Sequence, residues 1–241
     1  MRGPLLASFY TPIYWSCSRM KKLLQGIVDF RRNVQPGYRE KFARLALGQS
    51  PDALLIACSD SRVVPNVFAS ADPGDLFVVR NVGNLVAPAA DDGHTRKDAS
   101  DAAAIEFAVG HLNVADIIVC GHSECGAMQA LLGGRHRVEP FHLRYWLRHG
   151  DDALARYELA ETLDPTLAPH NQLSQLNVMQ QLRHLYTYPL VRQHVDSGRL
   201  RLHAWWFELK NADVYAYDDS ARRFTVIDDE VADRLLRKLS S

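Results

Sequence analysis

Two short polar segments of the chain carry residue types that can bind a metal ion and do chemistry. They are CSDSR at residues 58–62 and GHSECG at residues 121–126. Cys58, His122 and Cys125 would supply two thiolates and one imidazole, a set of donors that suits a tetrahedral zinc ion. A structural zinc site usually has four such ligands, whereas a catalytic site leaves one position open. Because only three donors of this kind occur here, the sequence favours a catalytic zinc site.

The fourth position of this predicted site has two candidates, Asp60 and a water molecule. Zinc with two thiolates and a neutral imidazole is formally neutral, so it should acidify a bound water less than three neutral histidines would. Arg62 lies two residues after Asp60 and can hold the carboxylate away from the metal in a charge-assisted pair. Asp60 could then accept a hydrogen bond from the bound water. Asp60 and Arg62 are therefore the candidate catalytic residues.

Each candidate ligand also has a simpler interpretation. A His-x-x-Cys pair alone is more often a hydrogen-bonded core histidine and a buried thiol than a metal site. The additional Cys58 at the end of a predicted strand strengthens the metal interpretation. A disulfide between Cys58 and Cys125 is a further alternative, and it is disfavoured because nothing in the sequence indicates an oxidising compartment.

Short apolar runs without alternation predict the strands that position these residues. The predicted strands cover residues 53–58, 75–82, 116–122, 199–209, 214–218 and 223–227. The predicted helices cover residues 100–112, 126–132, 141–160 and 171–195, the last broken near Pro189. This order predicts one α/β domain with a mostly parallel β-sheet flanked by helices. Ligands bind beyond the carboxyl ends of parallel strands, so the two polar segments are expected to meet at one site.

The N-terminal part is expected to form a helical arm. Apolar residues recur at helical spacing from Leu23 to Phe30 and again within residues 37–48, which predicts two helices. Residues 1–19 contain two prolines and no continuous apolar segment of the kind found in secretory signals. We expect residues 1–19 to be a disordered extension or to precede a start at Met20, and residues 20–241 to form a single domain. A cytoplasmic location follows as an expectation.

Composition places the chain among ordinary soluble globular proteins. Its 241 residues are 47% hydrophobic and 23% charged, and only 4 are cysteines, which excludes disordered and disulfide-rich classes. The 28 basic and 28 acidic residues cancel, so net charge gives no reason to expect a nucleic-acid partner. No apolar run approaches the roughly 18 residues that a membrane span requires, and we expect no membrane span.

Three motifs resemble those of the β-class carbonic anhydrases: CSDSR, RNVGNLV at residues 80–86, and GHSECGAM at residues 121–128. The resemblance extends from about Leu23 to Ile227. It implies that Cys58, His122 and Cys125 bind one zinc ion per subunit and that Asp60 and Arg62 form the Asp/Arg dyad of the family. The implied reaction is the reversible hydration of carbon dioxide to bicarbonate and a proton.

The resemblance also implies a substrate pocket. Its substrate-binding residues would be Gln49, Phe77, Val82, Phe107 and Gly126. Gln49 lies where plant-like members, whose fourth zinc position is open, carry a glutamine that binds substrate. Leu55 stands where bicarbonate-regulated bacterial members carry a tryptophan, so the chain resembles them less. Phe77, Val82 and Phe107 would form an apolar wall, and Phe107 replaces a tyrosine that is common at its position. The Gly126 N–H would donate to a substrate oxygen.

In this family the pocket lies between two subunits, with Gln49, Phe77 and Phe107 facing the zinc of the other subunit. The resemblance therefore implies a homodimer or a higher homo-oligomer such as a homotetramer. One alternative function is hydrolysis of carbon disulfide or carbonyl sulfide on the same scaffold. Another is a zinc-stabilised assembly protein without catalysis. The Asp60–Arg62 pair argues against the second, because a structural zinc site needs no carboxylate to orient a water.

Overall fold

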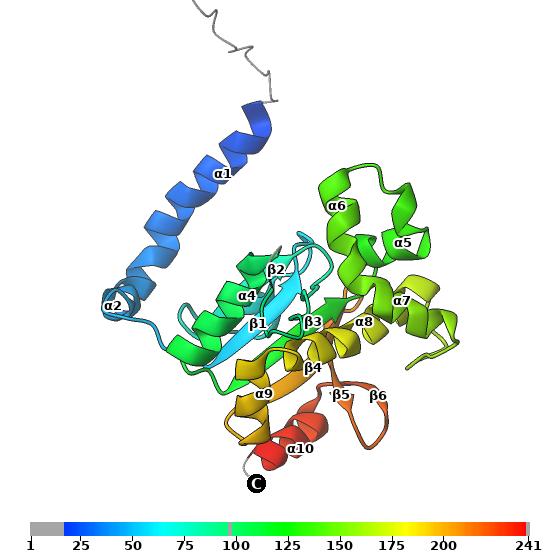
Figure 1. The fold of residues 1–241 in the computed structure, drawn as a ribbon. Helices are drawn as coiled ribbons and strands as arrows, with labels where there is room; N and C mark the ends of the chain where they lie inside the picture. The colour runs from blue at the N-terminus through cyan, green and yellow to red at the C-terminus, as the bar shows by residue number, and fades with distance from the viewer. Residues whose placement is uncertain (1–16, 96–97, 240–241) are drawn as a thin grey trace, which may run out of the picture. The chain divides into compact units, whose positions relative to one another are not determined.

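The structure, a computed structural model, describes residues 17–95 and 98–239 (Figure 1). It divides into two units, Met1–Gly48 and Gln49–Ser241. The expectation of a disordered extension falls mostly on residues 1–16, which lie outside the described residues. Among the described helices, none is both long enough and apolar enough to cross a lipid bilayer.

The first unit is helical from Cys17 to Leu45, as expected for an N-terminal arm. Helix α1 (Cys17–Asp29) continues through a π-helical turn, η1 (Phe30–Val34), into helix α2 (Gln35–Leu45). Helix α1 begins three residues before Met20, where the sequence pattern placed its start. Helix α2 has a proline in its first turn, a position where the missing N–H costs nothing.

The second unit is built around one six-stranded sheet. The strands are β1 (Ala53–Cys58), β2 (Leu76–Asn81), β3 (Asp116–His122), β4 (Arg201–Glu208), β5 (Asp213–Asp218) and β6 (Arg223–Val226). They are arranged in the order β2-β1-β3-β4-β5-β6. Strands β2, β1, β3 and β4 are parallel, which confirms the mostly parallel sheet. Strands β5 and β6 are antiparallel, because their short connections allow no crossover.

Helices flank this sheet, and most of them match the predicted ranges. They are α3 (Pro65–Phe68), α4 (Ala99–Glu106) with η2 (Phe107–His111), α5 (Gly126–Leu132), η3 (Arg135–Arg137), α6 (Phe141–Trp146), η4 (Leu147–Gly150), α7 (Asp151–Glu158), α8 (Pro169–Tyr186), α9 (Pro189–Asp196) and α10 (Asp229–Leu239). The predicted break near Pro189 is the start of α9. Helices α3 and α10 were not predicted.

The core lies on both faces of β1 and β3. Leu54 of β1 packs with Ile105 of α4 and Val178 of α8 on one face, and Leu55 packs with Phe207 on the other. Such burial on both faces explains why β1 reads as a continuous apolar run. Helix α8 lies across β3 and β4 in Figure 1. The sheet therefore holds the carboxyl ends of β1 and β3 at one edge of a rigid core.

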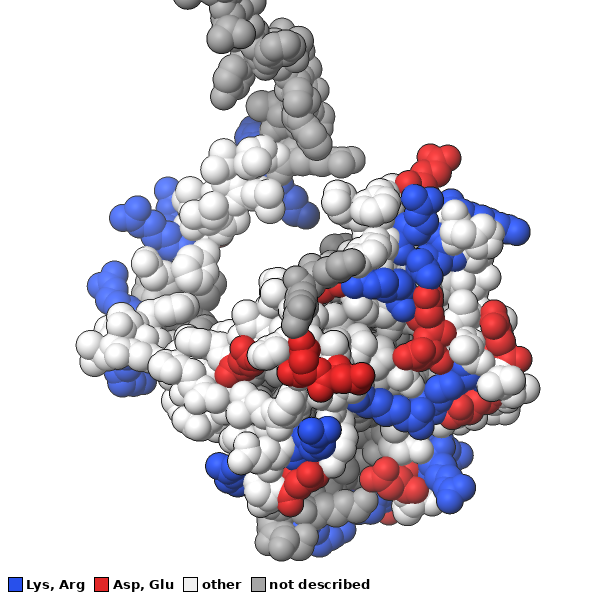
Figure 2. All heavy atoms as spheres, viewed as in Figure 1, with Lys and Arg blue, Asp and Glu red and all other residues white. Residues whose placement is uncertain are grey.

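Charged residues are mixed over the surface of the second unit that is visible in Figure 2. Lysine and arginine side chains alternate there with aspartate and glutamate side chains. The face shown therefore presents no extended surface of one charge sign, in keeping with the balanced composition.

Candidate metal centre

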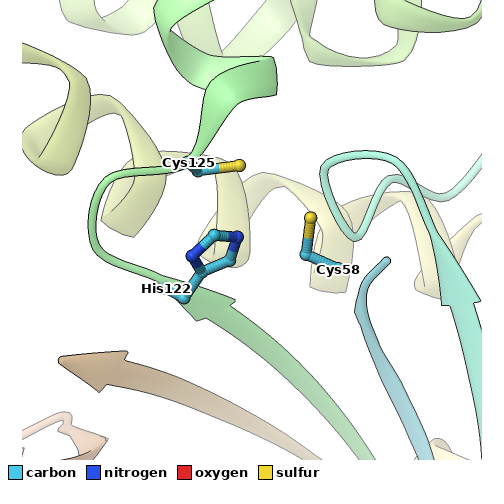
Figure 3. Close-up of side chains that lie close together, drawn as sticks. All are labelled: Cys58, His122 and Cys125. Carbon is cyan, nitrogen blue, oxygen red and sulfur yellow. The ribbon is translucent and has the colours of Figure 1, made fainter. Parts of the chain in front are cut away.

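The two polar segments meet as the sequence predicts. Cys58 ends β1 and His122 ends β3, and these strands are neighbours in the parallel sheet. Cys125 follows three residues later, at the N-cap of α5. The two sulfurs and a ring nitrogen of His122 lie within 4.8 Å of one another, and their side chains converge in Figure 3. All three residues are buried.

The histidine has one ring nitrogen left without a protein partner. His122 Nδ1 donates a hydrogen bond to the Ser123 carbonyl at 2.7 Å, which leaves Nε2 as the atom with the lone pair. Nε2 is buried and has no hydrogen-bond partner among the described residues. A buried polar atom without a partner is costly, and a metal ion removes that cost. This orphaned nitrogen beside two thiols fits zinc.

The two thiols are free, so the alternative of a Cys58–Cys125 disulfide is wrong. A hydrogen bond from the Cys125 thiol, with another from the Gly83 N–H, lowers the pKa of Cys58 to about 4. The adjacent Cys58 thiolate and burial raise the pKa of Cys125. The two sulfurs therefore favour unequal protonation, with Cys58 the more acidic of the pair. Zinc binding would release the remaining thiol proton, because zinc binds thiolates.

The dyad residues form a bidentate ion pair beside the ligands. Arg62 Nε donates to Asp60 Oδ1 at 2.9 Å, and Arg62 Nη2 donates to Oδ2 at 2.7 Å. These hydrogen bonds hold the pKa of Asp60 well below its usual value. Within residues 17–95 and 98–239, no carboxylate joins the cluster of ligand atoms. Arg62 Nη2 also donates to the Glu124 carbonyl at 3.0 Å, which ties the two polar segments together.

Sequence reasoning missed Arg80, which fixes the loop after β1. Its guanidinium donates to the Cys58 carbonyl at 3.0 and 3.1 Å and to the Asp60 carbonyl at 2.7 Å. A charged residue inside the apolar run of β2 was the available signal, since a charge in such a strand needs a partner. Arg80 thus sets the backbone that carries both a ligand and a dyad residue.

Sequence reasoning also missed the residues that hold the Cys125 loop. Glu124 has a left-handed φ of 56°, a conformation that non-glycine residues rarely adopt. The Asn171 side chain accepts from the Glu124 N–H at 2.8 Å and donates to its carboxylate at 3.1 Å. His170 contacts the same carboxylate at 2.9 Å. The start of α8 therefore stabilises the strained residue just before a metal ligand.

The residues expected to bind substrate fall into two groups. Val82 and Gly126 are each next to a residue of the metal centre. Val82 precedes Gly83, whose N–H donates to Cys58 Sγ, and Gly126 follows Cys125. Phe77 pairs with Leu54, four residues from Cys58 along β1, or about 13 Å at the usual rise per residue. Its ring contacts that of Phe107 at 5.9 Å between centroids.

Gln49 belongs to neither group. It is exposed and lies four residues before β1 begins, at the end of that strand opposite Cys58. In a single chain the structure therefore brings Val82 and Gly126 to the metal centre, and leaves Gln49, Phe77 and Phe107 away from it.

Comparison with known proteins identifies the family. The family profile described as carbonic anhydrase matches residues 53–214. The chain is 31% identical to beta carbonic anhydrase 1 of Caenorhabditis elegans, over 92% of this chain and 93% of that one. The chain belongs to the β-carbonic anhydrase family. It is also 38% identical to a carbonic anhydrase of Pseudomonas aeruginosa, over 85% of this chain and 90% of that one.

Solved β-carbonic anhydrases share the fold. The β-carbonic anhydrase CcaA superposes with a TM-score of 0.77 at 34% identity and covers 86% of this chain and 99% of its own. A tetrameric β-carbonic anhydrase of Sordaria macrospora gives a TM-score of 0.71 at 30% identity, with 83% and 96% covered.

Family membership confirms the activity that the sequence motifs implied. As a β-carbonic anhydrase, the chain catalyses hydration of carbon dioxide and uses zinc, for which Cys58, His122 and Cys125 are positioned. Neither a zinc-stabilised assembly protein nor a hydrolase of carbon disulfide or carbonyl sulfide is favoured by these relatives.

Proposed function

We propose that this carbonic anhydrase works with an open fourth zinc position, as plant-like members do, and that Asp60 and Arg62 are its catalytic residues. The observation that carries the proposal is the bidentate Asp60–Arg62 pair, which engages both carboxylate oxygens while the carboxylate stays outside the cluster of ligand atoms. A carboxylate held in this way can orient a water molecule, and it leaves the fourth zinc position open to that water.

Each residue then has a distinct role. When bound by Cys58, His122 and Cys125, zinc supplies a Lewis acid that makes a water molecule nucleophilic near neutral pH. Asp60, kept ionised by Arg62, accepts a hydrogen bond from the attacking water. This hydrogen bond orients a lone pair of the water oxygen toward the carbon of carbon dioxide. The Gly126 N–H, at the N-terminus of α5, donates to an oxygen on which negative charge develops.

The rest of the pocket, we propose, comes from a second copy of the chain. Phe77 and Phe107 contact each other about 13 Å along the sheet from Cys58 of their own chain, and Phe107 is 40% exposed. A homodimer would place this pair and Gln49 against the metal centre of the other subunit, as an apolar wall and an amide donor. A homotetramer, the state of the Sordaria macrospora relative, would retain such dimers.

A reducing compartment suits this site. Cys58 and Cys125 are free thiols, and an oxidant that joined them would destroy the ligand set. We therefore propose that the enzyme works in the cytoplasm.

Asp60→Ala tests the catalytic assignment. The variant should keep its zinc and lose hydration activity by about 10²-fold or more, since a positioned proton acceptor is typically worth that much. Zinc content per subunit and stopped-flow hydration rates across pH provide the measurement. Full turnover in Asp60→Ala would show that Asp60 does not orient the nucleophile, and loss of zinc would show that it acts as a ligand.

A further inference from the structure

The turn after β2 brings a backbone N–H to one of the metal ligands. Gly83 donates from its N–H to Cys58 Sγ at 3.3 Å. The turn adopts left-handed conformations at Gly83, with a φ of 84°, and at Asn84, with a φ of 46°. Such a turn has no regular secondary structure to fix it, so the direction of the Gly83 N–H depends on what holds the peptide groups on either side.

The peptide group that contains the Gly83 N–H is held by Trp146. The indole Nε1 of Trp146 donates to the Val82 carbonyl at 2.8 Å. That carbonyl and the Gly83 N–H belong to one planar peptide group. The indole, the peptide and Cys58 Sγ therefore form a single chain of hydrogen bonds, in which donation to the carbonyl also strengthens the N–H as a donor.

The following peptide group is held from α8. Asn177 Nδ2 donates to the Gly83 carbonyl at 3.1 Å. Gln181 Nε2 donates to Asn177 Oδ1 at 2.8 Å, and Gln181 Oε1 accepts from the Val86 N–H at 2.8 Å. Asn177 is 1% exposed and Gln181 is fully buried. Two amides one helical turn apart thus hold both ends of the turn.

Space restricts the turn as well. A Cβ atom on Gly83 would lie 2.9 Å from the Cβ of Ala127 in α5, closer than such atoms approach. The turn is therefore packed directly against the helix that follows Cys125, and only a glycine fits there.

We propose that Trp146, Asn177 and Gln181 are positioning residues for the metal centre, which direct the Gly83 N–H at the Cys58 thiolate and so determine how strongly that sulfur donates to zinc. A hydrogen bond to a thiolate withdraws charge from the sulfur. This would leave the metal more electrophilic and offset the weak acidification expected from two anionic ligands. The proposal concerns the zinc site and is independent of the roles proposed for Asp60 and for a dimer.

Trp146→Phe tests it most directly, because phenylalanine keeps an aromatic ring and removes only the N–H donor. In protein loaded with cobalt(II), the thiolate-to-cobalt charge-transfer band reports the charge on sulfur. We expect this band to move to longer wavelength in Trp146→Phe. The control is Trp205→Phe, since Trp205 packs in a different hydrophobic cluster from Cys58, Cys125 and Trp146, and there the band should not move.

Asn177→Leu is the second test variant, because leucine has a side chain of similar size that cannot form hydrogen bonds. Its band should move in the same direction, and competition with a chelator should show zinc affinity reduced about 10-fold or more, as for other residues that support metal ligands. Gln172→Met is the control, because Gln172 is a half-buried amide of the same helix whose Nε2 donates to the Leu167 carbonyl and not to the turn.

Activity is not needed to interpret these measurements. An unchanged band in folded, metal-loaded Trp146→Phe and Asn177→Leu would overturn the proposal, and so would an equal shift in the controls. If Asn177→Leu does not fold, Trp146→Phe decides by the same criterion. If neither variant folds, these side chains are requirements for folding and the positioning role is rejected.

Discussion

The three ligands differ from every other thiol or imidazole in the described chain by their mutual placement. Cys120 shows the contrast, because it is a cysteine on the same strand as His122 and yet is not one of the ligands. Complete burial raises the pKa of Cys120 to about 12, so it stays a neutral thiol. Residue type alone therefore does not make a ligand, and a second sulfur or a nitrogen within reach is needed.

Substitution of the two cysteines makes this difference measurable. Cys125→Ser should lose zinc and hydration activity together, because a serine hydroxyl is a poor zinc ligand near neutral pH. Cys120→Ser should retain both, since Cys120 belongs to the core behind the site. Zinc per subunit by atomic emission, with hydration rates, is the measurement. A full zinc complement in Cys125→Ser would exclude that residue as a ligand.

Among the elements, β3 and α8 depend on close contact at Gly121. A Cβ atom there would lie 2.5 Å from Val178 Cγ2 and 3.2 Å from Trp206 Cδ1. Gly121→Ala should therefore push α8 from the sheet and lower the free energy of unfolding by about 1–3 kcal/mol. Chemical denaturation measures this, and an unchanged midpoint would show that the helix adapts at no cost.

Gly126→Ala is the matched substitution at the metal centre. Apart from its chain neighbours and the backbone of its own helix, no atom of the described residues lies within 4 Å of a Cβ built on Gly126. The free energy of unfolding should therefore change by less than about 0.5 kcal/mol. Hydration activity should nevertheless fall, because the methyl group would enter the space proposed for substrate oxygens. Equal activity in Gly126→Ala and the parent chain would remove Gly126 from the substrate pocket.

The hairpin of β5 and β6 is joined to α10 through a carboxylate with a lowered pKa. Hydrogen bonds from the Ser220 hydroxyl and N–H lower the pKa of Asp218 from 3.8 to about 2. Arg234 of α10 donates to the same carboxylate at 2.7 Å. Because the folded-state pKa is the lower one, ionised Asp218 stabilises the fold above the unfolded-state pKa, and this contribution disappears as the pH falls toward 2.

Asp218→Asn should accordingly be less stable than the parent chain at neutral pH, with a difference that shrinks below about pH 4. Unfolding midpoints across pH measure the difference. Asp219→Asn, at an exposed position of the same turn, is the control and should follow the parent chain at every pH. A difference that stays constant down to pH 2 would contradict this linkage.

At the scale of the whole molecule, the proposed pocket requires two copies of the chain, and complementation can test this. Gln49→Ala and Asp60→Ala subunits should each be nearly inactive alone. In a mixed dimer, the zinc of the Gln49→Ala chain would face an intact Gln49 and keep its own Asp60. Random pairing of equal amounts would then restore about a quarter of the parent activity, because half the dimers are mixed and each has one complete site.

The measurement is the hydration rate of co-expressed or refolded mixtures, compared with the two variants mixed after separate folding. No recovery in mixed dimers of verified composition would place Gln49 outside the pocket of the other subunit.

The sequence by itself determined the ligand set and the elements that carry it. Cys58 and His122 each end an apolar run long enough for a buried strand, and parallel strands bring their carboxyl ends to one edge. The Asp60–Arg62 pair was also predictable, because two residues in one loop need no tertiary contact to meet. Helices α3 and α10 were not predicted. Helix α3 has a single turn, whereas the helical spacing of Val231 and Leu235 in α10 was a signal that was overlooked.

Only the tertiary structure decided what surrounds those residues. Arg80, Trp146 and Asn177 act at the site through contacts with backbone atoms far away in sequence, and residue type does not encode which carbonyl a donor will reach. The same holds for Phe77, whose distance from the metal centre follows from strand register, and for Phe107, whose ring contacts that of Phe77. Local pattern specifies elements, whereas hydrogen-bond partners and distances between elements arise only when the chain packs.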